Sequence, residues 1–239
     1  MKKIFSVFAI LVVIFSCEKG PCDDPINGPC PYPEISDDIK GEQRYKALNL
    51  SEETLDCITT EGLVETCLNY PEFYLIWIRT PLQRGYDYIR SIFNGLRELE
   101  VRNDAPKFLL KKYLSLNPRT DTVNMEIIQK GEYSFKIVYL ALIFSQSTNL
   151  EPLTTKEKIE LIEKSNYLYD QLTNDYLVLN PIVILMGRLM YKDGYEPLIN
   201  VYNKNSLLKF CLSNCILINE LRIMIKSMSD NYLVYLKNQ

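Results

Sequence analysis

The chain has 239 residues, of which 47% are hydrophobic and 24% charged, with a formal net charge of −3. It contains no histidine, which excludes His-based nucleophilic sites, His-ligated zinc and imidazole proton shuttles. Its nine glycines form neither a Walker loop nor a dinucleotide-binding fingerprint. No basic arm or stripe is present to neutralise phosphates. We therefore expect no nucleotide cofactor and no nucleic-acid partner.

Residues 1–16 have the organisation of a secretory signal peptide. Lys2 and Lys3 precede a mainly apolar run that ends at Phe15 and is followed by Ser16. This run is too short to cross a bilayer as a helix. We expect that the chain is exported and that residues 1–16 are removed. Without the two leader lysines, the formal charge falls from −3 to −5.

The sequence Ile14-Phe15-Ser16-Cys17 resembles the lipobox of bacterial lipoproteins. The resemblance implies that the Cys17 thiol is acylated, with palmitate among its lipids, and becomes the mature N-terminus. It also implies a lipid-anchored protein of the bacterial cell envelope, at the outer membrane, facing either the periplasm or the cell surface. The alternative is an ordinary signal peptide that happens to be followed by a cysteine.

Residues 17–44 are predicted to form a flexible, acidic, proline-rich tether. The segment holds five prolines and three glycines and has almost no large apolar side chains, so it has little surface to bury. A chain that begins near Tyr45 is therefore expected to fold independently. Cys22 and Cys30 each end a Gly-Pro-Cys sequence, and in an oxidising compartment they favour a disulfide that closes a small loop.

The other cysteines of the mature chain are expected to be buried, unreactive thiols in a helical core. Their spacing does not match the Cys-x-x-Cys of a zinc site, so the sequence predicts neither a metal site nor a cofactor. These residues are Cys57, Cys67, Cys211 and Cys215.

From Tyr45 to the end of the chain, helical patterns follow one another with short connections. In the first half, we expect helices that begin at Ser51 and Thr60 and a long amphipathic helix over 82–102. Asn103-Asp104-Ala105-Pro106 then predicts the start of another helix. No pair of β-strands is predicted.

The second half continues in the same way. We expect helices over 124–146, which Gly131 weakens or breaks, and over 154–172, which begins with a capping box. Asn180-Pro181 is predicted to start the next helix, and Asp193-Gly194 to turn the chain into 195–202. A last helix is expected over 206–228.

These elements predict an all-α domain over 45–239, as an irregular helical bundle or a short HEAT-like α-solenoid. Residues 180–202 resemble a HEAT repeat, with a helix that starts at a proline, an Asp-Gly turn and a second helix; residues 93–113 repeat this pattern faintly. With residues 62–71, residues 93–99 and the lipobox, the chain also resembles a group of uncharacterised, all-helical bacterial lipoproteins. This resemblance bears on location and fold and implies no activity.

Carboxylates are the remaining candidates for catalysis, because envelope glycan hydrolases use a pair of them. Glu61 with Glu65, or Glu98 with Glu100, would supply such a pair, and helical spacing places only the first pair on one face. Seventeen tyrosines are the other notable feature, and one of their clusters is Tyr191, Tyr195 and Tyr202. Most are expected to pack between helices, and a minority to line a binding surface.

We therefore expect a non-catalytic, lipid-anchored envelope protein that mediates protein–protein interaction. Its partner would be another envelope or extracellular protein, and an inhibitor or immunity-type role is one form of this function. The alternatives are a carboxylate-dependent glycan hydrolase and a glycan-binding lipoprotein.

Overall fold

The computed structural model describes residues 25–172 and 175–239 and is all-helical. These residues form fourteen α-helices and one 3-10 helix, which confirms the predicted all-α class. Their β-type pairing is limited to a single parallel bridge between Ile26 and Ile58. Within the described ranges, every helix is too short or too polar to cross a membrane.

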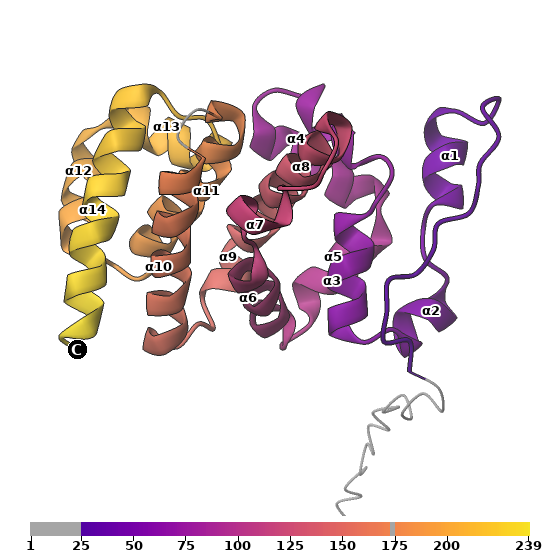
Figure 1. The fold of residues 1–239 in the computed structure, drawn as a ribbon, viewed down its shortest axis with the longest axis horizontal. Helices are drawn as coiled ribbons and strands as arrows, with labels where there is room; N and C mark the ends of the chain where they lie inside the picture. Colours follow the sequence, from indigo (N-terminus) through magenta and orange to yellow (C-terminus); the bar gives the residue numbers. More distant parts are fainter. Residues whose placement is uncertain (1–24, 173–174) are drawn as a thin grey trace, which may run out of the picture.

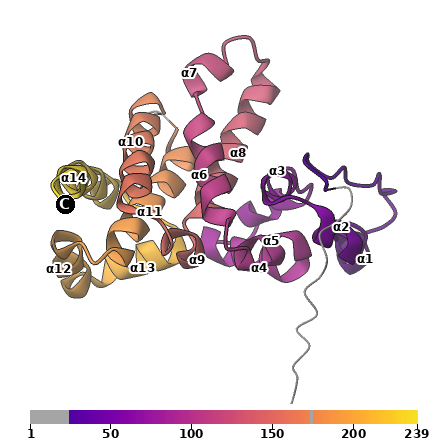
Figure 2. The same ribbon diagram turned by 90° about the horizontal axis from the view of Figure 1, so that it is seen from below.

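The helices stand side by side in a row along the long axis of the molecule, with the first helices at one end and α14 at the other (Figure 1). The second view separates two layers (Figure 2). α3, α6, α8, α10 and α14 lie in one layer, and α4, α5, α9, α12 and α13 lie in the other. One continuous hydrophobic cluster extends from Leu48 to Leu236.

The first half of the chain contains six α-helices and the 3-10 helix η1. Ser51 and Thr59 cap α2 and α3 with their hydroxyl oxygens, which accept hydrogen bonds from the backbone of the first turn. The bounds are α1 Gly41–Ala47, α2 Glu52–Cys57, α3 Thr60–Leu68, η1 Phe73–Trp77, α4 Leu82–Ile92, α5 Asn94–Val101 and α6 Ala105–Ser115.

The second half contains eight α-helices. The predicted capping box of Thr154 and Glu157 is present at the start of α10. Gly131 lies inside α8 without interrupting it. The bounds are α7 Pro118–Asp121, α8 Ile127–Phe144, α9 Ser147–Leu150, α10 Thr155–Gln171, α11 Tyr176–Lys192, α12 Glu196–Lys204, α13 Ser206–Asn214 and α14 Asn219–Lys237.

The predicted long helix over 82–102 is wrong, because the chain breaks at Phe93. Phe93 has extended backbone angles, φ −118° and ψ 115°, and its ring is fully buried. The side chain of Asn94 bonds both backbone groups of Leu50: Oδ1 accepts from the amide at 2.9 Å, and Nδ2 donates to the carbonyl at 2.7 Å. These contacts to a distant segment stabilise the break between α4 and α5.

The predicted helix over 206–228 is also divided. Cys215 adopts the left-handed conformation, φ 54° and ψ 43°, and ends α13. The amide of Ile216 then donates to the carbonyl of Cys211, which closes the last turn. Before it, α11 begins at Tyr176 and not at Asn180, because Asp175 caps it and Pro181 lies within its second turn.

α8 and α11 pack against each other and form the centre of the core. Residues 137–144 of α8 are all buried, as are most residues from Val178 to Met190 of α11.

Glycine permits two other pairs of segments to approach closely. A Cβ on Gly85 of α4 would lie 2.4 Å from the backbone oxygen of Ile76. Gly187 plays a similar part in α11, where a Cβ would lie 2.7 Å from Leu212 of α13.

Residues 25–44 differ from the predicted tether, because they lie against the domain. The amide of Ile26 donates to the carbonyl of Cys57, and the carbonyl of Ile26 accepts from the amide of Thr59, both at 2.9 Å. The hydroxyl of Tyr32 donates to the carbonyl of Thr66 at 2.8 Å, and its ring contacts Tyr70 and Phe93. A few well-placed side chains therefore offset the low apolar content of this segment. Residues 17–24 of the predicted tether lie outside the described residues.

Candidate binding site

The predicted lipid-attachment residue, Cys17, and the predicted disulfide partner Cys22 lie outside the described residues. Cys30, the other half of that predicted disulfide, is a free thiol in the structure. Its backbone amide donates to the Thr66 hydroxyl at 2.9 Å. The free thiol of Cys30 differs from the predicted Cys22–Cys30 pairing.

Of the four cysteines predicted to be buried thiols, three have that state and one does not. Cys67, Cys211 and Cys215 are free and buried. Burial raises the pKa of Cys215 to about 11, so this thiol is protonated at neutral pH. Cys57 is disulfide-bonded, which corrects the prediction for that residue. Among the described residues, the acidic and thiol side chains form no group of three that would hold a metal ion.

Glu61 and Glu65 lie together on α3, as their spacing predicts, but each is paired with a lysine of α6. The Lys111 ammonium lies 2.7 Å from Glu61, and the Lys112 ammonium lies 2.5 Å from Glu65. These four side chains line a small pocket of about 170 Å³. Both nominated carboxylates are therefore engaged in ion pairs between α3 and α6.

Glu98 and Glu100 are engaged as well. Glu98 accepts from Arg102 at 3.0 Å, and Glu100 accepts from Arg90 at 2.5 Å. Glu100 also accepts from the buried phenol of Tyr86 at 2.6 Å, and burial raises the pKa of that phenol. The contacts of Glu100 connect α4 to α5.

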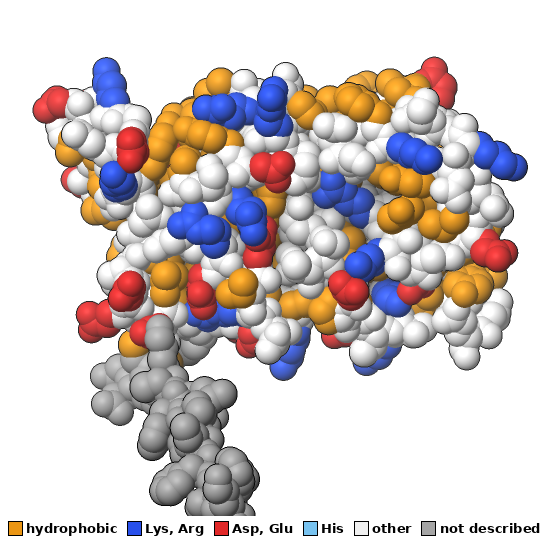
Figure 3. Space-filling model, turned by 180° about the vertical axis from the view of Figure 1, so that it is seen from behind, with side chains coloured by type: hydrophobic (Ala, Val, Ile, Leu, Met, Phe, Trp, Pro, Cys, Tyr) orange, Lys and Arg blue, Asp and Glu red, His pale blue; other side chains and the backbone are white. Residues whose placement is uncertain are grey.

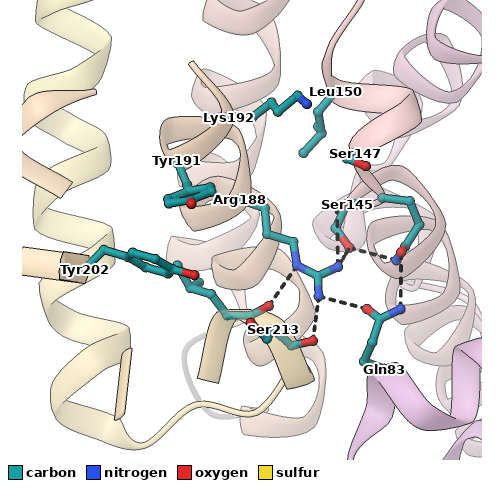
Figure 4. A pocket seen from close by; sticks show the side chains of 11 residues that line it. Gln83, Ser145, Ser147, Leu150, Arg188, Tyr191, Lys192, Tyr202 and Ser213 are labelled. Carbon is teal, nitrogen blue, oxygen red and sulfur yellow. Dashed lines mark hydrogen bonds between the residues drawn. The ribbon is translucent and has the colours of Figure 1, made fainter. Parts of the chain in front are cut away.

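A larger pocket of about 470 Å³ opens between α4, α9, α11, α12 and α13 (Figure 4). Its volume falls in the range of small-molecule sites. Apolar, hydroxyl, amide and cationic side chains line it, and no carboxylate does. The lining residues are Gln83, Ser145, Gln146, Ser147, Leu150, Arg188, Tyr191, Lys192, Tyr202, Leu212 and Ser213.

Arg188 lies at the centre of this pocket and contacts three separate helices. Its Nε donates to the carbonyl of Leu212 at 2.9 Å, and Nη2 donates to the carbonyl of Ser213 at 3.1 Å. Nη1 donates to the hydroxyl of Ser145 at 3.2 Å, and Nη2 also donates to Oε1 of Gln83 at 2.8 Å. All these acceptors are neutral, and no carboxylate within the described ranges forms an ion pair with Arg188. Its positive charge is therefore not balanced by direct contact.

Gly187, the residue before Arg188, makes this position of Arg188 possible. Because Gly187 has no side chain, α13 can pack closely on α11, with Leu212 over the glycine. This brings the last carbonyls of α13 within reach of the guanidinium, which satisfies carbonyls that have no partner inside their own helix. Ser145, which follows the last residue of α8, also accepts a hydrogen bond from this guanidinium.

Two tyrosines form one wall of the pocket. The ring centroids of Tyr191 and Tyr202 lie 4.4 Å apart, with a 43° angle between the rings. Tyr202 extends from α12 toward Ser213 and Arg188, and Lys192 extends toward Leu150 (Figure 4). The ammonium of Lys192 lies 3.1 Å from Glu151, whose side chain is 68% exposed.

Most of the other tyrosines pack between helices, as predicted. Six of the seventeen are buried and four are more than a third exposed. The exposed ones are Tyr74, Tyr176, Tyr191 and Tyr235. Tyrosine therefore serves mainly the packing of this fold, and the Tyr191–Tyr202 pair is the part of it that lines the large pocket.

Sequence reasoning identified Tyr191 and Tyr202 as members of a cluster but missed Arg188. A signal was present, because Arg188 is the single charged residue between Tyr176 and Met190. A lone cation in an apolar helix needs polar partners. Those partners, Gln83, Ser145 and Ser213, come from three distant segments and carry no local pattern that would have identified them.

No protein-family model, no curated protein and no solved structure matches this chain.

Proposed function

We propose that this chain is a non-catalytic binding protein of the bacterial cell envelope, anchored by lipid at Cys17, that docks a partner protein. The observation that carries the docking proposal is the surface of α13 and the turn after it. Four large apolar side chains in this short stretch are more than a third exposed: Leu207, Phe210, Ile216 and Ile218. Several exposed large apolar side chains within one short surface segment favour a protein-interaction surface.

Leu207 and Phe210 are 45% and 53% exposed and lie one helical turn apart on α13. Hydrophobic side chains gather in several areas of the side that carries α12 and α13, with charged side chains between them (Figure 3). Aromatic and aliphatic anchors surrounded by polar groups fit the core and rim of a protein interface. We name Leu207, Phe210, Ile216 and Ile218 the α13 patch.

The paired carboxylates support binding over glycan hydrolysis. Each of the four nominated glutamates contacts a lysine or an arginine. A hydrolase needs one carboxyl that is protonated and a second that faces the same substrate. These ion pairs engage all four carboxylates, which favours the binding proposal.

The location rests on the lipobox resemblance of Ile14-Phe15-Ser16-Cys17. Acylation at Cys17 places the domain at the envelope, at the outer membrane, and an envelope or extracellular protein is then its partner. The test of this part is metabolic labelling with palmitate. The Cys17→Ala chain should lose the label and retain residues 1–16, whereas continued labelling would contradict the assignment.

The docking proposal is tested by cross-linking in intact cells that express the full-length chain. A partner captured by the parent should be lost with Leu207→Glu plus Phe210→Glu, because charged side chains do not enter an apolar interface. The matched control is Ile127→Glu, since Ile127 is 84% exposed at the start of α8. Both variants should keep the parent's helical circular dichroism.

The same experiment separates binding from catalysis. Glu61→Gln plus Glu65→Gln should leave capture of the partner unchanged. Cleavage of peptidoglycan or another glycan by the purified parent, abolished in this variant, would replace the docking proposal with the hydrolase.

A further inference from the structure

The large pocket around Arg188 carries a second possibility, distinct from protein docking. Its volume of about 470 Å³ is sufficient for a small organic molecule, whereas the pocket beside Glu61 has about 170 Å³. Leu150 and Leu212 supply apolar surface, and Tyr191 and Tyr202 supply aromatic surface. Such a mixture, with a few polar groups that converge on it, is usual for small-molecule sites.

The charge of the pocket determines whether it favours a negatively or a positively charged ligand. Arg188 and Lys192 line it, and the ammonium of Lys209 lies 5.5 Å from the ring centroid of Tyr202. The lining contains no Asp or Glu. The nearest acidic contacts lie outside it: Glu151 on Lys192, and Asp87, which accepts from Gln83 at 2.9 Å. The pocket is therefore electropositive and favours an anion.

Hydrogen-bond donors remain available at the same place. Within the part of the chain that the structure describes, the hydroxyls of Ser147, Ser213, Tyr191 and Tyr202 have no protein partner. These groups and the Lys192 ammonium can donate to a carboxylate. Arg188 is already bonded to its neutral acceptors, so it contributes charge and holds Ser213 and Gln83 in position.

The aromatic wall specifies the rest of the ligand. Tyr191 and Tyr202 meet at 43°, which leaves a tilted ring face beside the cations. A ring on the ligand can pack on this face in an offset or tilted arrangement. We propose that the pocket binds a small organic anion in which a carboxylate is attached to a ring, independently of the α13 patch.

The test is isothermal titration calorimetry of the full-length chain with benzoate as the probe and benzamide as its neutral isostere. Benzoate should bind with a Kd of about 1 mM or lower. Benzamide should bind at least about tenfold more weakly, because it has the same ring without the charge. Raising the salt concentration should weaken benzoate binding, since Lys192 and Lys209 are accessible to ions.

Substitutions in the pocket test whether benzoate binds there. Lys192→Gln should weaken benzoate about fivefold and leave benzamide unchanged. Tyr202→Ala should weaken both probes, because it removes the aromatic wall. The matched control is Lys130→Gln, an exposed lysine of α8 that lies outside the pocket, and it should change neither. The two lysine variants should melt at the temperature of the parent, and Tyr202→Ala, which loses packing against Tyr191, should still be fully folded at the temperature of the titration.

Three outcomes would overturn the proposal. The first is equal binding of benzoate and benzamide, and the second is the absence of benzoate binding at about ten times the expected Kd. The third is an equal effect of Lys192→Gln and Lys130→Gln. Loss of partner capture in the α13 variants bears on the docking proposal alone, so the two proposals fail separately.

Discussion

Residues 25–40 and the hairpin of α11 and α12 both lie against the helical core, but different interactions hold them there. The hairpin is stabilised by hydrogen bonds inside each helix and by burial of the apolar residues of α11. The 25–40 segment contains no helix, and it is held by long-range hydrogen bonds to α2 and α3 and by the ring contacts of Tyr32. The first kind of stability can be inferred from local sequence, whereas the second depends on partners more than thirty residues away.

The surface of α3 that contacts residues 25–40 has the space and the hydrogen-bonding groups that this segment needs. A Cβ on Gly62 would lie 2.7 Å from the backbone oxygen of Gly28 and 3.1 Å from that of Ile26. Thr66, one turn later, accepts the amide of Cys30 with its hydroxyl and the phenol of Tyr32 with its carbonyl. Glycine and threonine on one face of α3 therefore provide the contact that the proline-rich segment needs.

The largest expected effect comes from removing the segment. A chain that begins at Gly41 should lose about 3 kcal/mol of unfolding free energy relative to one that begins at Pro25. That loss corresponds to a melting temperature lower by about 9 °C. Thermal unfolding in the presence of a reducing agent measures this loss, because the reductant keeps the thiols of both chains from forming disulfides. Equal melting of the two chains would restore the tether interpretation.

The second prediction compares two glycines in helices. Gly62→Ala should destabilise the protein by about 2 kcal/mol, because the added methyl meets backbone that cannot move without breaking the Ile26 hydrogen bonds. Gly131→Ala should stabilise it by about 0.5 kcal/mol, because a Cβ there meets no atom within 4 Å. Urea unfolding measures both. A Gly62 variant as stable as the parent would mean that the segment does not contact α3.

The third prediction uses pH. Burial is the main cause that raises the pKa of the Tyr32 phenol in the folded state. Its contribution is therefore complete below the unfolded pKa of about 10 and declines as the pH rises above it. Tyr32→Phe should cost about 1 kcal/mol at pH 7 through the lost bond to Thr66.

Near pH 11 the cost of Tyr32→Phe should fall to about zero, because only the parent must then keep a buried phenol protonated. Urea unfolding at the two pH values measures this change, and Tyr235→Phe, at a 45% exposed position, is the control. A cost that does not change with pH would show that Tyr32 is solvated.

The smallest effect is expected for Cys30→Ala, at less than about 0.5 kcal/mol, because the half-buried thiol is free and the backbone supplies the main hydrogen bond. If Cys30 instead formed the disulfide with Cys22 that the sequence suggests, the variant would cost about 2.5 kcal/mol under oxidising conditions and much less under reducing ones. Unfolding with and without reductant distinguishes the two states.

The all-α class and most helix positions could be predicted because they depend on local signals. The capping box at Thr154 and the Asp193-Gly194 turn are examples. The breaks at Phe93 and Cys215 could not be predicted in this way. Asn94 gains two bonds to Leu50, and Cys215 occupies a left-handed position that glycine usually fills. Tertiary contacts overrode a continuous helical pattern at Asn94.

The candidate pocket was predictable only in part. The tyrosine cluster on α11 and α12 indicated an aromatic feature, and the pocket uses Tyr191 and Tyr202 from it. Its charge was not predictable, because Arg188 becomes an unbalanced cation only when α13 and α4 bring neutral acceptors to it. The ion pairs of Glu61 and Glu65 were not predictable for a similar reason, because Lys111 and Lys112 come from another helix.

The contacts of Gln83 affect the order in which parts of the chain reach their final structure. Its Oε1 accepts from Arg188, 105 residues later, and from the thiol of Cys215, 132 residues later. An early helix, α4, therefore obtains its final surroundings only after most of the chain has been synthesised. Contacts of such sequence separation slow folding. We expect the first half of the chain to remain incompletely ordered until α13 docks. The two ends of the row of helices should therefore unfold together in one cooperative transition.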